Sequence, residues 1–219
     1  MPIISPSILT NDPEEFKRLI EDYQKFAQRV HIDIVDGVFA NNRTISENDV
    51  WWPEGMIVDM HMMVEKPSEH VDAMLRLKPR LVIFHAEAAE GLLGSFGRLR
   101  EAGIKVGVAF LKTTYFGNFE NIIKYVDHVM IFSGEIGHYG GEADLLQLAK
   151  VEVVKAIKPG LEMGWDGGAK LENVGEIVRA GVDVVTVGSA IAKAENPREA
   201  YEKMTAEANR VNEGAQWLR

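Results

Sequence analysis

The sequence predicts an α/β fold, a single (β/α)8 TIM barrel with eight parallel strands, formed as one domain by residues 1–219. Short β-branched apolar runs alternate with helical patterns, which is typical of parallel strands joined by right-handed crossovers. Eight such units occur in 219 residues, and α/β barrels commonly contain about 200–250 residues. An open doubly wound sheet could use similar units, but a repeat of eight favours closure.

Eight runs are expected as strands, and several are apolar almost throughout, as strands buried on both faces are. They are Ile3–Leu9, Val30–Val35, Ile57–Val64, Leu81–Ala86, Ile104–Leu111, His128–Phe132, Leu161–Trp165 and Val182–Val187.

The segments between these runs carry helix signals. Asp12 is an expected N-cap and Pro13 a first-turn proline. Gly103 and Gly181 are expected just beyond helix ends. The expected helices are one from Asp12 that includes Phe16–Tyr23, one opened by Pro67, Leu92–Ala102, Ala143–Ile157, Leu171–Ala180 and Pro197–Val211. The range Asp36–Gly55 is expected as a long polar loop with at best a poor helix.

Composition excludes several classes of protein. The 46% hydrophobic and 26% charged content is that of a globular chain, and a net charge of −9 disfavours nucleic-acid and anionic-membrane partners. The chain has no cysteine, which excludes a disulfide scaffold, a thiolate-bound zinc site and a thiol nucleophile. No apolar run reaches the length of a membrane span, and the N-terminus lacks a basic segment typical of signal peptides. We expect a cytoplasmic protein.

Polar side chains gather where the predicted strands end, which is where barrels of this type carry their function. Side chains two apart project from the same side of a strand, and a closed barrel brings its strand ends into one mouth. The residues concerned are His31, Asp33, Asp59, His61, His85, Glu87 and Asp166. Two His and two Asp converging there would form a divalent metal site, and this ligand chemistry suits Zn, Fe or Mn. Asp36, before Gly37, is expected as a turn residue.

Small residues follow the last three predicted strands. They are Gly137, Gly140 and Gly141, then Gly167 and Gly168, then Gly188 and Ser189. Backbone N–H groups at such positions can approach an anion, and barrel phosphate sites typically use the loops after strands seven and eight. The sequence therefore predicts a phosphate subsite, and it contains no dinucleotide fingerprint, Walker loop or nucleophile elbow.

Two further patterns are interpreted structurally. Met60 and Met62 are expected to fill the core, since methionine packs into irregular gaps. The segment Trp51–Pro53 lies in the long second loop. It is interpreted as an oligomer contact in preference to a lid over the barrel mouth, so we expect a homo-oligomer.

Taken in order, the motifs resemble those of the ribulose-phosphate 3-epimerases and their sugar-phosphate relatives, over nearly the whole chain. The longest match is HIDIVDGVFANNRTI at His31–Ile45, and DMHMMVEKP at Asp59–Pro67 also matches. PSIL at Pro6–Leu9, FHAEA at Phe84–Ala88, DGG at Asp166–Gly168 and GSAI at Gly188–Ile191 follow the family order.

The resemblance implies a metal-dependent epimerisation at carbon 3 of a ketose phosphate, from D-ribulose 5-phosphate to D-xylulose 5-phosphate. It implies one divalent metal ion per chain (Zn, Fe, Mn or Co) held by His31, Asp33, His61 and Asp166. Asp33 and Asp166 would also act as the acid and base, one on each face of an enediolate. Ser7 and Met63 would contact the small-molecule sugar phosphate, with its phosphate on the late glycines.

The chain departs from the family pattern around the substrate. Val35 and Phe132 stand where the family has methionines, Leu111-Lys112 replaces Asn-Pro, and Asn41 replaces a proline. The loop Glu135–Glu142 is one residue longer than the family's, with an added acid. The alternatives are therefore a 3-epimerase of a six-carbon ketose phosphate such as allulose 6-phosphate, or a non-catalytic sugar-phosphate-binding homologue. A phosphohexulose synthase or decarboxylase is disfavoured, because Met60–Met62 offers no lysine after Asp59.

Overall fold

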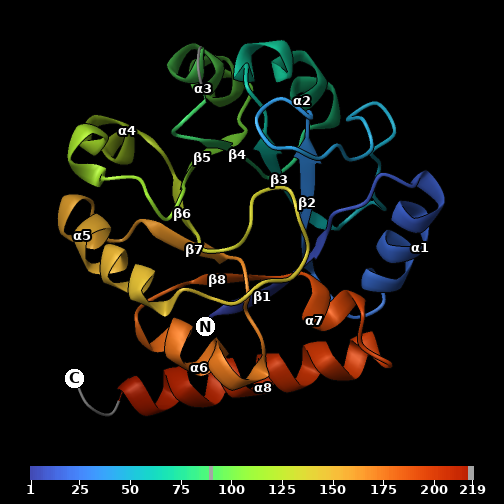
Figure 1. Ribbon diagram of the computed structural model, residues 1–219, viewed down its shortest axis with the longest axis vertical. Helices are drawn as coiled ribbons and strands as arrows, with labels where there is room; N and C mark the ends of the chain where they lie inside the picture. The colour runs from blue at the N-terminus through green and yellow to red at the C-terminus, as the bar shows by residue number, and fades with distance from the viewer. Residues whose placement is uncertain (89–90, 217–219) are drawn as a thin grey trace.

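The computed structural model describes residues 1–88 and 91–216, and within these ranges eight parallel strands form a closed barrel in the order β1 to β8 (Figure 1). β8 pairs with β1 and closes the barrel, with Ile3 opposite Val184. The strands are β1 Ile3–Ile8, β2 Arg29–Val35, β3 Ile57–Met63, β4 Leu81–His85, β5 Lys105–Phe110, β6 His128–Phe132, β7 Glu162–Asp166 and β8 Val184–Val187. The (β/α)8 prediction is confirmed, and each strand overlaps the run from which it was predicted.

Helices surround the barrel on its outer side (Figure 1). The α-helices are α1 Pro13–Tyr23, α2 Val71–Leu77, α3 Leu92–Glu101, α4 Glu120–Tyr125, α5 Ala149–Ile157, α6 Leu171–Arg179, α7 Ser189–Ala192 and α8 Pro197–Gln216. Short 3-10 turns η1 Pro67–Glu69, η2 Phe116–Asn118 and η3 Leu145–Leu148 precede α2, α4 and α5. No helix lies between β2 and β3, in a stretch that the structure describes throughout, as predicted for the polar loop.

Local signals explain where the helices begin. The Asp12 carboxylate accepts the backbone N–H of Glu14 at 2.9 Å and caps α1, as predicted. The helix predicted from Ala143 begins later, because Asp144 caps the 3-10 turn η3 and the α-helical geometry starts only at Ala149. Sequence reasoning missed α4, which has only six residues and no side-chain cap.

Most strand residues are buried because side chains on one face fill the barrel while those on the other pack under the helices. Trp165 of β7 and Phe84 of β4 are fully buried, as is Phe96 of α3, which packs against Phe84. Burial of each large apolar side chain stabilises the fold by about 1.5–3 kcal/mol. Met60 and Met62 are fully buried too, which confirms their predicted place in the core.

The amino-terminal end of the barrel interior contains an ionic cluster. Arg29 Nε donates to Asp59 at 2.6 Å, and its terminal nitrogens donate to Glu162. Arg80 donates to Glu162 at 3.0 Å, and His128 Nδ1 lies 2.9 Å from the same carboxylate. The prediction that Asp59 reaches the barrel mouth is therefore wrong. Asp59 lies on the same side of β3 as His61, but two residues earlier, so it faces Arg29 at the opposite end.

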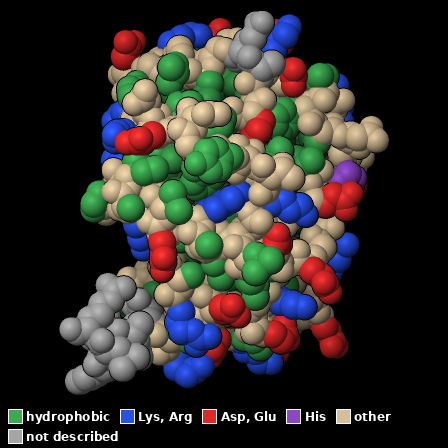
Figure 2. Space-filling model, turned by 60° about the vertical axis from the view of Figure 1, so that its left-hand side comes forward, with side chains coloured by type: hydrophobic (Ala, Val, Ile, Leu, Met, Phe, Trp, Pro, Cys, Tyr) green, Lys and Arg blue, Asp and Glu red, His purple; other side chains and the backbone are tan. Residues whose placement is uncertain are grey.

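The outer surface mixes charge with apolar groups. Figure 2 shows hydrophobic side chains interspersed with Lys, Arg, Asp and Glu on the side that carries α4 and α5. Tyr125, Leu146 and Val153 are exposed there. Among the described residues, no helix combines the length and the apolar character that crossing a membrane requires.

Candidate active site

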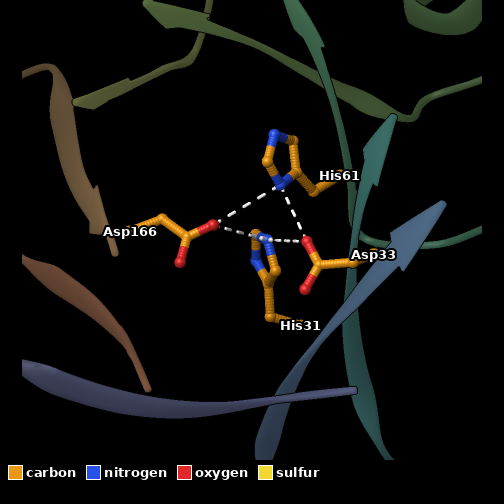
Figure 3. A group of neighbouring side chains, drawn as sticks. All are labelled: His31, Asp33, His61 and Asp166. Carbon is orange, nitrogen blue, oxygen red and sulfur yellow. Dashed lines mark hydrogen bonds and ion pairs between the residues drawn. The ribbon is translucent and has the colours of Figure 1, made fainter. Parts of the chain in front are cut away.

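Four side chains meet at the carboxyl-terminal end of the barrel (Figure 3). His31 and Asp33 come from β2, His61 comes from β3 and Asp166 ends β7. Each offers one nitrogen or oxygen, and these four atoms all lie within 4.8 Å of one another. Strand pairing explains part of this arrangement, because Asp33 lies beside His61 in the β2–β3 register. Closure of the barrel brings β7 to the same mouth.

The two carboxylates approach the histidine rings from opposite sides (Figure 3). His61 Nδ1 lies 2.8 Å from Asp33 Oδ1 and 3.5 Å from Asp166 Oδ2. His31 Nε2 lies 3.4 Å from Asp33 Oδ1 and 3.9 Å from Asp166 Oδ2. This buried His31 nitrogen has no hydrogen-bond partner, although its lone pair or proton faces the carboxylates. Two imidazole nitrogens and two carboxylate oxygens facing one point suit a divalent cation, and these residues could hold one.

The surroundings of Asp33 and Asp166 shift the pKa values of the two carboxyl groups in opposite directions. Burial by itself would raise the pKa of Asp33, but the nearby imidazoles of His31 and His61 and the hydrogen bond with His61 outweigh it and lower that pKa to about 2. Burial and the nearby charge of Asp33 raise the pKa of Asp166 to about 6. Two carboxyl groups with pKa values pushed apart are the arrangement from which enzymes draw an acid and a base.

A pocket adjoins the two carboxylates of this group, Asp33 and Asp166, and extends over the ends of β7 and β8. Its lining includes most of the predicted substrate-binding residues: Ser7, Met63, Gly137, Gly140, Gly167, Gly168, Gly188 and Ser189. Gly141 is the exception, since it is exposed and outside the lining. Phe132, Tyr139 and Thr186 also line the pocket, although sequence reasoning did not propose them as contacts.

The loop between β6 and η3 covers this pocket. The ring of Tyr139 packs beside Gly188, where a Cβ would come within 2.8 Å of it. The side-chain amide of Asn42 donates to the carbonyl of Gly137 and ties this loop to the loop after β2. The free volume beneath is only about 40 Å³, room for about three water molecules. A ligand much larger than a few water molecules does not fit this volume.

The acidic side chains at the two ends of this loop do not line the pocket. Glu135 and Glu142 are exposed, and neither lines the cavity. Their charges therefore do not face the positions of the late glycines. Gly167 and Gly168 both have positive φ, and a Cβ on either would overlap the backbone of Gly134 or Ala143. Only glycine fits where the loops after β6 and β7 pack together.

The remaining predicted polar residues differ in their surroundings. The Asp36 carboxylate accepts the backbone N–H groups of Val38, Phe39 and Glu65, which confirms it as a turn residue. His85 is fully buried, with Nε2 2.9 Å from His61 Nε2. Burial lowers the pKa of His85 to about 4, so the ring is neutral near pH 7.

The loop that follows β2 carries two tryptophans. Trp51 is 41% exposed and packs edge-on against Phe16 of α1, while Trp52 packs against the core. Neither side chain lines the pocket beside the four-residue cluster. The interpretation of this segment as an oligomer contact stays a prediction.

Comparison with known proteins places the chain among sugar-phosphate enzymes. Residues 3–192 match the protein family described as "Ribulose-phosphate 3 epimerase family". A ribulose-phosphate 3-epimerase from Mycobacterium leprae is 29% identical over 221 residues, covering 96% of this chain and 97% of its own. The Escherichia coli enzyme of the same name is 29% identical over 227 residues, with 96% and 97% covered. The Schizosaccharomyces pombe enzyme is 27% identical and covers 99% of this chain and 98% of its own.

Solved structures agree at the level of the fold. KGPDC from Streptococcus mutans superposes with a TM-score of 0.75 at 12% identity, covering 96% of this chain and 99% of its own. The 3-hexulose-6-phosphate synthase from Salmonella typhimurium superposes with a TM-score of 0.74 at 13% identity, with 95% and 99% covered. Because the family match spans residues 3–192 and the named relatives align over nearly their whole length, the chain belongs to the ribulose-phosphate 3-epimerase family and is an isomerase.

Proposed function

We propose that this protein is a metal-dependent 3-epimerase that interconverts D-ribulose 5-phosphate and D-xylulose 5-phosphate. The observation that carries the proposal is the convergence of His31, Asp33, His61 and Asp166 at the mouth of the barrel. Phosphate binding alone would need neither carboxylate. The names of the relatives from Mycobacterium leprae and Escherichia coli support the choice of a pentose phosphate.

The two carboxylates would divide the proton transfers. Epimerisation removes the proton on carbon 3 from one face of the sugar and returns a proton to the other face. Asp33 and Asp166 approach from opposite sides (Figure 3), so one would accept the proton while the other donates, and the roles would exchange in the reverse direction. Before a cation binds, Asp166 holds a proton more readily than Asp33, because burial and the charge of Asp33 raise the pKa of Asp166.

His31, Asp33, His61 and Asp166 would hold the cation. A bound divalent ion supplies Lewis-acid stabilisation of the negative charge that develops on the substrate oxygens. The four donors leave its identity open among Zn, Fe, Mn and Co. The ring positions of His31 and His61 would keep their nitrogens directed at this point, since both side chains are almost fully buried.

The phosphate would lie at the far end of the pocket, beside Gly167, Gly168, Gly188 and Ser189. Small residues there leave backbone N–H groups free to approach an anion. Ser7 and Met63 would contact the sugar between the phosphate and the carboxylates. The side chains of Glu135 and Glu142 are exposed and do not line this part of the pocket.

The test is proton NMR of metal-reconstituted protein with ribulose 5-phosphate in D2O. We expect deuterium at carbon 3 together with the appearance of xylulose 5-phosphate. If metal is bound at one ion per chain and neither signal appears, the pentose assignment is wrong, and allulose 6-phosphate is the next substrate to test. Absence of exchange with both sugars would leave the non-catalytic binder as the correct description.

A further inference from the structure

The far side of the His61 ring makes a contact that the proposed reaction does not use. Nδ1 of His61 faces Asp33 and Asp166, and Nε2 lies 2.9 Å from Nε2 of His85 on β4. We propose that His85 and Glu87 form a relay that positions His61 and sets its tautomer for cation binding. This inference rests on the metal site proposed above and assigns His85 as a positioning residue.

The proton positions follow from the contact between the two rings. A neutral imidazole has one N–H donor and one acceptor nitrogen. If Nδ1 of His61 directs its lone pair at a cation, its proton is on Nε2 and can be donated only toward His85. Nε2 of His85 must then be an acceptor, so the proton of His85 is on Nδ1. Because both rings are fully buried, no solvent competes for these positions.

Glu87 lies next to the other ring nitrogen of His85, the one that does not face His61. Nδ1 of His85 and Oε2 of Glu87 are both buried without a hydrogen-bond partner, and they lie 3.4 Å from each other. A small movement would make them donor and acceptor. A carboxylate behind a ligating histidine raises the basicity of that histidine and orients its ring. Here one more imidazole would carry the effect from Glu87 to His61.

The loop after β5 holds Glu87 in place. Glu87 Oε1 accepts hydrogen bonds from the backbone N–H of Leu111 at 3.1 Å and from the hydroxyl of Thr114. Lys150 of α5 donates to the carbonyls of Leu111 at 3.1 Å and Lys112 at 3.0 Å, which anchors the same loop. The relay therefore ends in a part of the chain that departs from the family pattern at Leu111 and Lys112.

A purely structural role for His85 makes a different prediction. The His85 ring packs against Phe39 and Phe132, with centroids 5.0 and 5.6 Å apart. An apolar side chain at position 85 would preserve that packing and remove only the acceptor. His128 provides a matched control, since it is also buried on a strand and paired with a glutamate, Glu162, but at the opposite end of the barrel.

The experiment measures the affinity of metal-free protein for Co²⁺ and Zn²⁺ by competition with a chelator. His85→Leu is expected to weaken affinity by about 10–100-fold, the range for lost outer-sphere partners of a metal ligand. His85→Gln, which returns an acceptor near the position of Nε2, is expected to recover most of the loss. His128→Leu should lower thermal stability without changing metal affinity.

The relay is wrong if His85→Leu binds both ions as tightly as the wild type, or if His128→Leu loses as much affinity. Should His85→Leu not fold, Glu87→Ala provides the second test, with a smaller loss in the same direction expected and no change overturning the proposal. Wild-type protein that binds neither ion would instead refute the metal site of the proposed function. Wild-type protein that binds metal and epimerises while the variants do not lose affinity refutes only the relay.

Discussion

The hydroxyl of Tyr139 donates to the carbonyl of Ser7 at 2.8 Å and accepts the backbone N–H of Leu9 at 2.7 Å. One phenol oxygen thus joins the loop after β6 to the end of β1. Burial raises the pKa of Tyr139, so the hydroxyl stays protonated and keeps its donor. The loop that this phenol fastens lies over the pocket, whose free volume is about 40 Å³.

Replacing Tyr139 by Phe should loosen the loop without emptying the space that its ring fills. The two lost hydrogen bonds together cost about 1–3 kcal/mol, so faster hydrogen exchange is expected at the amides of Gly137–Gly141, by about 5–150-fold. Tyr23→Phe is the matched control, because the Tyr23 hydroxyl reaches the same Ser7 carbonyl at 3.5 Å from α1. Equal exchange in wild type and Tyr139→Phe would show that the hydroxyl does not fasten the loop.

Asp166→Asn should abolish net epimerisation and leave the barrel folded. The amide cannot move a proton, and loss of an acid or base costs about 10²–10⁴-fold in rate. Asp33 remains, so one of the two epimers should still exchange its carbon 3 proton with D2O, at a reduced rate, without converting to the other. The measurements are turnover, deuterium incorporation from each epimer and the circular dichroism spectrum. Turnover at the wild-type level would remove Asp166 from the mechanism.

His61→Ala should reduce bound metal more than any change at His85 does. It deletes a donor atom, whereas the loss of an outer partner costs about 10–100-fold. Metal per chain is measured by mass spectrometry after equal exposure and dialysis. A stoichiometry that matches the wild type would mean that the four-residue ligand set is wrong.

With Glu162 replaced by Gln, the stability of the folded protein should depend less on pH in the acidic range. Burial alone would raise the pKa of Glu162, but hydrogen bonds and charge from His128, Arg29 and Arg80 outweigh it and hold that pKa well below its ordinary 4.5. The carboxylate therefore stabilises the folded protein above about pH 4.5, and this contribution is lost as the pH falls.

The measurement is the thermal midpoint of both proteins between about pH 3 and 7. At pH 7 the variant should melt lower, because Arg29 is buried and loses a charged partner. The difference should shrink toward pH 3. A constant difference at every pH would contradict the assigned role of Glu162.

Much of this protein could be predicted from local patterns. Alternating apolar runs and helix signals predicted all eight strands and the barrel, because parallel strands need crossovers and buried strands need apolar residues on both faces. The two-residue spacing of His31 and Asp33 placed both on one face of β2. Asp166 was expected at the same mouth because it follows the predicted seventh strand, and the motif resemblance then implied its role as a ligand and as an acid or base.

The same spacing rule failed at Asp59, because periodicity gives the face of a strand and not the height along the barrel axis. That height depends on strand tilt and register, which only the closed sheet determines. Local sequence likewise could not pair Tyr139 with Ser7, 132 residues away, or turn His85 toward His61. The sequence alone therefore determined the order of elements and the types of side chain at the mouth. The tertiary structure decided which of them meet, because such contacts depend on barrel closure and the folding of loops over it.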